Sequence, residues 1–182
     1  MNKERFLNLP NTLAFVRVLL APLIFFILVN TAMFEKSGIH ISWVNYFAAL
    51  LFVVAGITDF FDGFIAREWN ESTKLGSIID PLADKMLMLA GFLGLMYLGR
   101  ADAWAVFLIL TREFFITGLR VAAVSEGKSV AASIYGKIKT LFQLVAIGFL
   151  IMQWPFGTTL LWISVALTLY SGYEYTRDYF KD

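Results

Sequence analysis

The 182-residue sequence contains no cysteine and only one histidine, His40. Without cysteine the chain forms no disulfide and offers no thiolate to a metal, which suits a reducing compartment. Charged residues make up 16% of the chain, against about a quarter in a typical soluble domain, and the net charge is +1. The charge therefore predicts no nucleic-acid partner. No linker, repeat or low-complexity segment interrupts the sequence, which we interpret as a single domain over residues 1–182.

Apolar residues are present in excess, at 59% of the chain, with a mean hydropathy of +0.70. A membrane-spanning helix needs roughly 20 mostly apolar residues. Five runs qualify by composition, and the last is long enough for two spans because Trp154–Gly157 breaks it with Pro and Gly. The runs cover residues 13–29, 41–58, 82–98, 103–124 and 140–173. The predicted fold class is all-α integral membrane, a six-transmembrane-helix bundle with a short N-terminal interfacial helix over residues 1–9.

The basic residues predict the orientation of these spans. If the N-terminus is cytoplasmic, the inner segments hold most lysines and arginines, and the outer ones hold only Lys36 and Arg100. The inner set is Lys3, Arg5, Arg67, Lys74, Lys128, Lys137, Lys139, Arg177 and Lys181. Both termini and the acidic segment described next are therefore expected on the cytoplasmic side. His40 falls in an outer loop and is assigned no role.

The stretch TDFFDGFIAREWNESTKLGSIIDPLADK, residues 58–85, carries four aspartates in a mostly apolar chain: Asp59, Asp62, Asp80 and Asp84. In helices, the first two lie about 60° apart and the last two about 40° apart. The first pair is expected at the end of the second span. The second pair is expected to open the third span, with Asp80 as N-cap and Pro81 at the first helical position. A turn between the spans makes them antiparallel neighbours, so all four carboxylates can converge.

Converging carboxylates repel one another unless some are protonated or cations lie between them. An all-oxygen set favours Mg²⁺, Mn²⁺ or Ca²⁺ over zinc, and two such ions suit phosphoryl chemistry. Any one of these aspartates can instead simply cap a helix end and meet water. All four together, beside Arg67 and small residues that permit close approach, favour a functional site.

The spacing Asp59-x2-Asp62-Gly63-x2-Ala66-Arg67-x8-Gly76-x3-Asp80-x3-Asp84 resembles the signature of the CDP-alcohol phosphatidyltransferases. Eight positions at fixed gaps make this resemblance specific, and six spans agree with that family's fold. The resemblance implies a CDP-alcohol substrate such as CDP-diacylglycerol, and two Mg²⁺ or Mn²⁺ ions per active site. It implies that Asp59, Asp62 and Asp80 bind metal and that Asp84 is the base, with Asp84 also a candidate metal ligand. The residues implied to hold the CDP-diacylglycerol are Asp59, Asp62, Gly63, Ala66, Arg67, Thr73 and Gly76.

A second stretch, TREFFITGLRVAAVSEGKSVAASIYGKIKTLFQ at residues 111–143, resembles the corresponding segment of bacterial phosphatidylglycerophosphate synthases. The matching residues are Arg112, Glu113, Gly118, Leu119, Arg120, Ala132, Ser133, Gly136, Lys137, Lys139, Thr140 and Gln143. Physically, an arginine inside a membrane helix is expensive unless it faces a polar cavity. A cationic cavity suits an acceptor that carries a phosphate, as glycerol 3-phosphate does.

The predicted acceptor-phosphate residues are accordingly Arg112, Arg120, Lys137 and Lys139. An alternative stays open at this point, because Glu113 can pair with one of the arginines as an internal ion pair without substrate. The N-terminus departs from the family pattern. Asn11 and Arg17 keep a six-residue gap and are predicted nucleotide contacts, but Ala14 stands where relatives carry a hydroxyl, unless Thr12 supplies it.

The resulting prediction is a multi-pass enzyme of the bacterial inner membrane, active at the cytoplasmic face and surrounded by membrane lipids. Asp84 takes a proton from the 1-hydroxyl of glycerol 3-phosphate, the oxygen attacks the phosphorus attached to diacylglycerol, and CMP leaves. The resemblance further implies a homodimer. The alternatives are another acceptor (inositol phosphate, serine or phosphatidylglycerol), an aspartate-rich intramembrane prenyltransferase, and a divalent-cation transporter.

Overall fold

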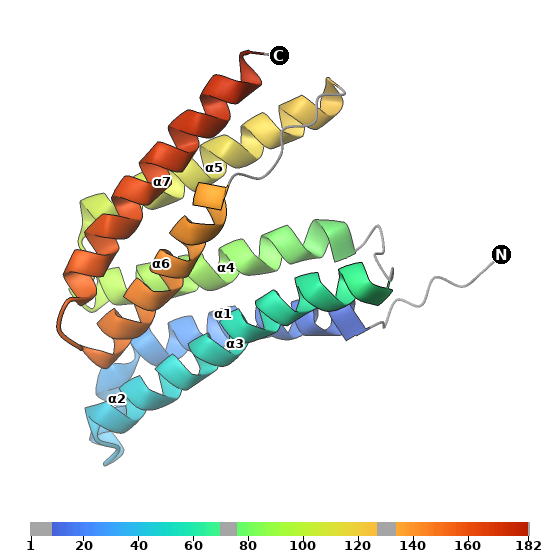
Figure 1. Cartoon of the computed structure of the whole chain (residues 1–182). Coiled ribbons are helices and arrows are strands. Elements are labelled where there is room, and N and C mark those ends of the chain that lie inside the picture. Colours follow the sequence, from blue (N-terminus) through green and yellow to red (C-terminus); the bar gives the residue numbers. More distant parts are fainter. Residues whose placement is uncertain (1–8, 70–75, 127–133, 182) are drawn as a thin grey trace. The chain divides into compact units, whose positions relative to one another are not determined.

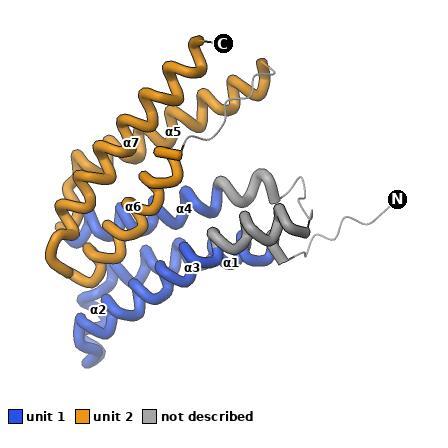
Figure 2. The backbone as a smooth tube through the Cα atoms, in the orientation of Figure 1, with its two compact units in different colours: residues 1–98 blue, residues 99–182 orange. Residues whose placement is uncertain are grey.

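The computed structural model describes the backbone of residues 9–69, 76–126 and 134–181, and the side chains of residues 12–58, 82–126 and 134–181. Within these ranges the chain is helical and contains no strand, in agreement with the predicted all-α class (Figure 1). The chain divides into two compact units, residues 1–98 and residues 99–182 (Figure 2). Each unit is described by itself.

The first unit contains α1 (Leu9–Val29), the short α2 (Thr31–Lys36), α3 (Ile41–Trp69) and α4 (Gly76–Tyr97). α1 packs against both α4 and α3, and α3 also contacts α4. The buried side chains along these interfaces are mostly apolar, among them Ile24, Leu28, Phe52, Leu87 and Phe92. α1 is therefore the central helix of this unit, held against the two helices that carry the four aspartates.

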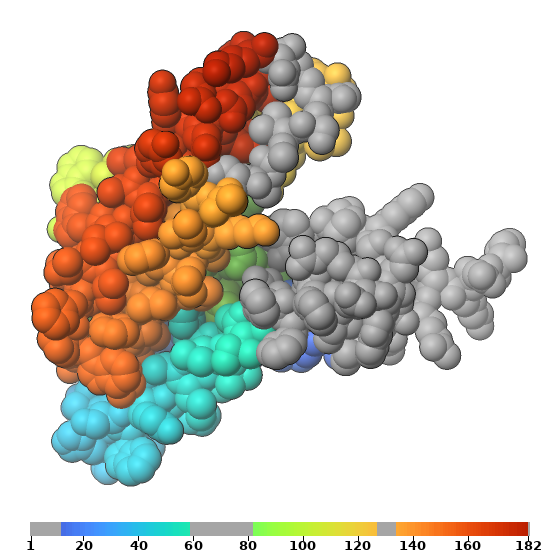
Figure 3. Space-filling model, viewed as in Figure 1, coloured from blue at the N-terminus to red at the C-terminus, as the bar shows by residue number. Residues whose placement is uncertain are grey.

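The second unit contains α5 (Ala103–Ser125), α6 (Ile134–Met152) and α7 (Gly157–Tyr179). α7 packs against both α5 and α6, and α6 and α7 lie side by side in Figure 3. Asp102 caps α5, accepting a hydrogen bond from the Ala105 N–H at 3.0 Å. The Arg100 guanidinium donates to the Ile151 carbonyl in the last turn of α6 at 2.9 Å, and burial lowers the pKa of this arginine.

Several predicted boundaries are confirmed. The second span begins at Ile41, α5 begins at Ala103, and the break at Trp154–Gly157 separates α6 from α7. Gln153 and Phe156 in this break have positive φ angles, so the chain leaves the helical conformation there. The predicted N-terminal interfacial helix falls almost wholly on residues 1–8, outside the described residues. The short α2 was not predicted, because its six residues carry too weak a periodic signal.

The predicted start of the third span is wrong. α4 begins at Gly76, so Asp80 and Pro81 are its fifth and sixth residues rather than its N-cap and first residue. A proline there removes one hydrogen bond to the carbonyl four residues earlier, a loss that membrane helices tolerate. α1 tolerates Pro22 in its interior in the same way. A proline marks only a probable helix boundary, and here the helix continues through it.

The apolar helices mark a membrane protein. Within the described residues, three helical segments are long and apolar enough to cross a membrane: Thr12–Val29, Ile41–Thr58 and Ile134–Met152. Large apolar side chains remain exposed on long helices of both units, for example Leu19 in α1, Phe114 in α5 and Leu141 in α6. Such exposure is costly in water and expected in lipid.

Gly94 sets the distance between α1 and α4. A Cβ at this position would lie 2.7 Å from Cδ1 and 2.9 Å from Cβ of Leu28, which is fully buried in α1. We expect Gly94→Ala to destabilise the protein by about 1–2 kcal/mol, because overpacking exceeds the gain of about 1 kcal/mol in helix propensity. The measurement is the apparent unfolding temperature in detergent.

Gly148 in α6 supplies the matched control for Gly94. A Cβ at Gly148 meets no described atom within 4 Å, so Gly148→Ala should leave the unfolding temperature unchanged or raise it. If Gly94→Ala is as stable as Gly148→Ala, α1 does not approach α4 at Leu28 as closely as described.

Candidate active site

The four aspartates lie on two helices of the first unit that contact each other. Asp59 and Asp62 are in α3, three residues apart, and Asp80 and Asp84 are in α4, four residues apart. The helical register thus keeps each pair on one side of its helix, about 60° and about 40° apart. The backbone confirms the helical placement from which convergence was predicted. The convergence itself stays a prediction, because the side chains of Asp59, Asp62 and Asp80 lie outside the described residues.

The donor set fits a hard divalent cation by its chemistry. Carboxylate oxygens are the ligands that Mg²⁺ and Mn²⁺ prefer, and four of them on two contacting helices supply more than one ion needs. Among the side chains that the structure describes, no group of three or more His, Cys, Asp or Glu residues gathers.

The predicted nucleotide contacts are only partly described. Gly63, Ala66 and Arg67 follow the first aspartate pair within α3, and Gly76 is the first residue of α4. Thr73 and the Asn11 side chain lie outside the described residues. Arg17 in α1 is buried completely, at 0% exposure. α1, which carries Arg17, packs against both helices that hold the aspartates, and the predicted contact of Arg17 with the nucleotide stays a prediction.

A polar cluster lies in the core of the second unit, formed by Arg112, Glu113, Lys139 and Ser171. Arg112 Nη1 donates to Glu113 Oε1 at 3.3 Å, and Lys139 Nζ donates to the same oxygen. The side chains of Arg112 and Lys139 are only 10% and 8% exposed, whereas that of Glu113 is 23% exposed. One carboxylate oxygen therefore pairs with two nearly buried cations from two helices, α5 and α6, and the three side chains together keep a net charge of +1. The ion pair left open by the sequence is formed, and Lys139 joins it.

The other side of the Arg112 guanidinium is held by α7. Arg112 Nη2 donates to Ser171 Oγ at 2.5 Å. Gly172 leaves room for the arginine, since a Cβ there would lie 3.0 Å from both Cγ and Nε of Arg112. Ser171 and Gly172 were not predicted, because the contact joins residues 59 positions apart and neither residue type signals it in the sequence.

Arg120 and Lys137 are placed differently from this cluster. The Arg120 guanidinium lies over the ring of Tyr175, 5.8 Å from its centre, in a cation–π arrangement. Lys137 precedes Lys139 by two residues, about 200° around α6, and its side chain is exposed. Of the four predicted acceptor residues, the structure therefore brings Arg112 and Lys139 together around Glu113 and places Lys137 on a different side of α6.

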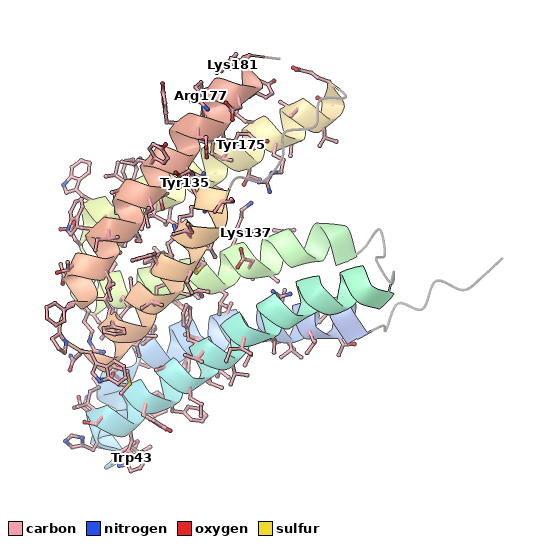
Figure 4. All side chains as sticks on the ribbon, viewed as in Figure 1. Trp43, Tyr135, Lys137, Tyr175, Arg177 and Lys181 are labelled. Atoms are coloured by element: carbon pink, nitrogen blue, oxygen red, sulfur yellow. The ribbon has the colours of Figure 1, made fainter. Side chains whose placement is uncertain are left out.

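Several charged residues that the structure describes in the second unit lie toward one end. Lys137 lies near the start of α6, and Arg177 and Lys181 lie at the end of α7 (Figure 4). Tyr179 in the last turn of α7 donates to Glu126 Oε1 at the end of α5, at 3.1 Å. Arg100 lies at the opposite end, beside the end of α6. The orientation of these helices across a membrane stays a prediction. Trp43, labelled in Figure 4, lies in the first turn of α3 in the other unit.

Comparison with known proteins gives one consistent family. Residues 7–170 match the CDP-alcohol phosphatidyltransferase family. The chain is similar to proteins named CDP-diacylglycerol–glycerol-3-phosphate 3-phosphatidyltransferase from three bacteria, each 37% identical to it. The match covers 92% of this chain and 93% of the Bacillus subtilis protein, 93% and 96% for Rickettsia typhi, and 92% and 92% for Escherichia coli K12.

The matched region contains both stretches that the sequence singled out, the aspartates of α3 and α4 and the basic cluster of α5 and α6. The family signature and the similarity over nearly the full length agree with each other. The chain therefore belongs to the CDP-alcohol phosphatidyltransferase family.

Proposed function

We propose that the protein transfers a phosphatidyl group from CDP-diacylglycerol to glycerol 3-phosphate, forming phosphatidylglycerophosphate and CMP. The single observation that carries this proposal is the match over nearly the whole chain to relatives named for this reaction. Their shared name specifies the donor and the acceptor. The buried cations of Arg112 and Lys139 give a physical reason for an acceptor that carries a phosphate.

The residues divide between the two substrates. Asp59, Asp62, Asp80 and Asp84 would hold two Mg²⁺ or Mn²⁺ ions, which when bound polarise the diphosphate of the donor. Asp84 takes the proton from the attacking hydroxyl of glycerol 3-phosphate, and the bond between phosphorus and CMP breaks as the new ester forms. Neither cysteine nor a nearby histidine is required, since the hydroxyl attacks directly. The other residues proposed to bind CDP-diacylglycerol are Asn11, Arg17, Gly63, Ala66, Arg67, Thr73 and Gly76.

The basic residues serve the acceptor. Arg112 and Lys139 lie close enough to share one carboxylate oxygen, so the same pair can share a phosphate oxygen. Arg120 and Lys137 would contribute positive potential at the same end of the second unit. The fold proposed around this site has six transmembrane helices (α1, α3, α4, α5, α6 and α7) in a bacterial inner membrane. Its termini and site face the cytoplasm, and we propose a homodimer.

The test is product identification with the purified chain. Labelled glycerol 3-phosphate, CDP-diacylglycerol and Mg²⁺ should give labelled phosphatidylglycerophosphate and one CMP per product. Excess EDTA should reduce product formation to the level without enzyme, and added Mg²⁺ or Mn²⁺ should restore it. Product formation that survives thorough chelation would disprove the metal role.

The competing functions are decided in the same assay. Inositol phosphate, serine and phosphatidylglycerol replace glycerol 3-phosphate one at a time, and a preferred product from any of them identifies a different acceptor. Release of pyrophosphate from a prenyl diphosphate, with no CMP from the CDP-lipid, would instead indicate a prenyltransferase. Metal flux into protein-containing liposomes would indicate a transporter.

A further inference from the structure

We propose that the Glu113 carboxylate occupies the place that the phosphate of the acceptor takes, and that it leaves this place when the acceptor binds. The inference rests on the proposed function for the identity of the acceptor. It makes Glu113 a specificity-determining residue, since an incoming acceptor has to compete with a built-in anion for Arg112 and Lys139.

The first argument is the geometry of the carboxylate. A single oxygen, Oε1, accepts from both Arg112 Nη1 and Lys139 Nζ, on α5 and α6 respectively. A phosphate oxygen accepts charge-assisted hydrogen bonds from the same two donor types. The two cations are nearly buried, so in the absence of a ligand they need an anion near them. Glu113 supplies that anion.

The second argument is that Glu113 can move while the cations stay. Its side chain is the most exposed of the three, at 23%, so its rotation away from the two cations meets the least obstruction. Arg112 is fixed independently, because Nη2 remains hydrogen-bonded to Ser171 Oγ and the guanidinium lies against Gly172. Departure of the carboxylate thus leaves an intact cationic site rather than a collapsed one.

The exchange predicts that a neutral alcohol is a poor acceptor. Glycerol carries no charge to stabilise Arg112 and Lys139, so its binding would not replace the ion pair with Glu113. A phosphate monoester carries up to two negative charges, more than the one that it displaces. Selection therefore depends on the difference in binding free energy between Glu113 and the acceptor for the same two cations. A molecule that binds these cations more weakly than Glu113 does is rejected.

The experiment measures binding without turnover. Full-length wild type and Glu113→Gln are purified in detergent, and unfolding temperatures are recorded against concentration of inorganic phosphate, glycerol 3-phosphate or glycerol. Without ligand the variant should be less stable than wild type, because two buried cations lose their anion. Its apparent affinity for phosphate and glycerol 3-phosphate should be roughly tenfold higher, as expected from one lost competing charge–charge interaction. Glycerol should stabilise neither protein.

Two further variants keep the test decisive. Glu126→Gln removes a carboxylate elsewhere in the second unit, where it accepts from Tyr179, and should leave anion affinity unchanged. Glu113→Asp retains the charge but draws it back by one methylene, so its affinity should lie between wild type and Glu113→Gln. If Glu113→Gln does not fold, Glu113→Asp decides alone. Affinity equal to or below that of wild type in the folded Glu113 variants would overturn the inference.

Kinetics separate this inference from the proposed function. In Glu113→Gln the KM for glycerol 3-phosphate should fall while the KM for CDP-diacylglycerol stays the same, a split that a purely structural role would not produce. If phosphatidylglycerophosphate forms but the KM for glycerol 3-phosphate does not fall, the inference fails and the function stands. If the variant binds phosphate more tightly than wild type does, but wild type forms no phosphatidylglycerophosphate, the proposed reaction fails and the anion exchange stands.

Discussion

Asp84→Asn should reduce the rate of phosphatidylglycerophosphate formation by roughly 10³-fold, within the range that a general base contributes. The amide keeps the size of the side chain but accepts no proton at neutral pH. Asp84 lies in α4, one turn after Asp80, and α4 packs against α1. Its neighbours Ala83 and Leu87 are buried. The measurement is initial rate at saturating concentrations of both substrates.

Binding of the donor distinguishes a lost base from a lost fold. Asp84→Asn should still be stabilised against thermal unfolding by CDP-diacylglycerol, because the other proposed donor contacts are untouched. The control is Asp178→Asn, which removes an exposed carboxylate paired with Arg177 at the end of α7 and should leave the rate unchanged. A rate for Asp84→Asn within about threefold of the control would refute the base assignment, given the expected loss.

Arg112→Ala should raise the KM for glycerol 3-phosphate by about 10–100-fold, since a hydrogen bond between charged groups contributes about 1.5–3 kcal/mol. The KM for CDP-diacylglycerol should change little. Arg112→Lys should recover part of the loss, because lysine restores the charge but cannot donate to Ser171 and to a phosphate in the same planar geometry. The readout is the KM of each substrate at saturating concentration of the other.

Arg177→Ala is the matched control for Arg112. Arg177 is exposed at the end of α7 and paired with Asp178, so its removal takes away one positive charge without touching the buried cluster. Both KM values should stay near those of wild type. If Arg112→Ala raises the KM for CDP-diacylglycerol instead, the arginine serves the donor, and the assignment of the basic cluster to the acceptor is wrong.

The two substitutions in the basic cluster are expected to have opposite effects on acceptor affinity. Arg112→Ala removes a donor that an acceptor phosphate would use, and Glu113→Gln removes a competitor for that donor. Adjacent residues on α5 with opposite signs of effect are difficult to explain by general damage to the fold. The opposite effects follow directly if Arg112 binds the acceptor phosphate and Glu113 occupies the place of that phosphate in its absence.

Local patterns predicted much of the fold. Apolar runs of sufficient length located the long helices, and Pro and Gly in Trp154–Gly157 located the turn between α6 and α7. The start of α4 was missed because Pro81 is a strong local signal for a helix start, yet the helix accommodates it six residues in. The six-span topology, predicted from hydropathy, stays a prediction. The cytoplasmic location of the basic segments, predicted from charge, also stays a prediction.

The sequence by itself determined the family, because the aspartates of α3 and α4 stand at fixed spacings along the chain. The proposed chemistry requires the carboxylates of each pair on one side of their helix, and spacing along a helix decides this directly. It also singled out Arg112 and Glu113 as charges inside an apolar helix. Only the tertiary structure decided their partners: Lys139 from α6 and Ser171 and Gly172 from α7. The physical reason is that spacing along one helix is set by its 3.6-residue period, whereas contacts between helices depend on how their surfaces pack.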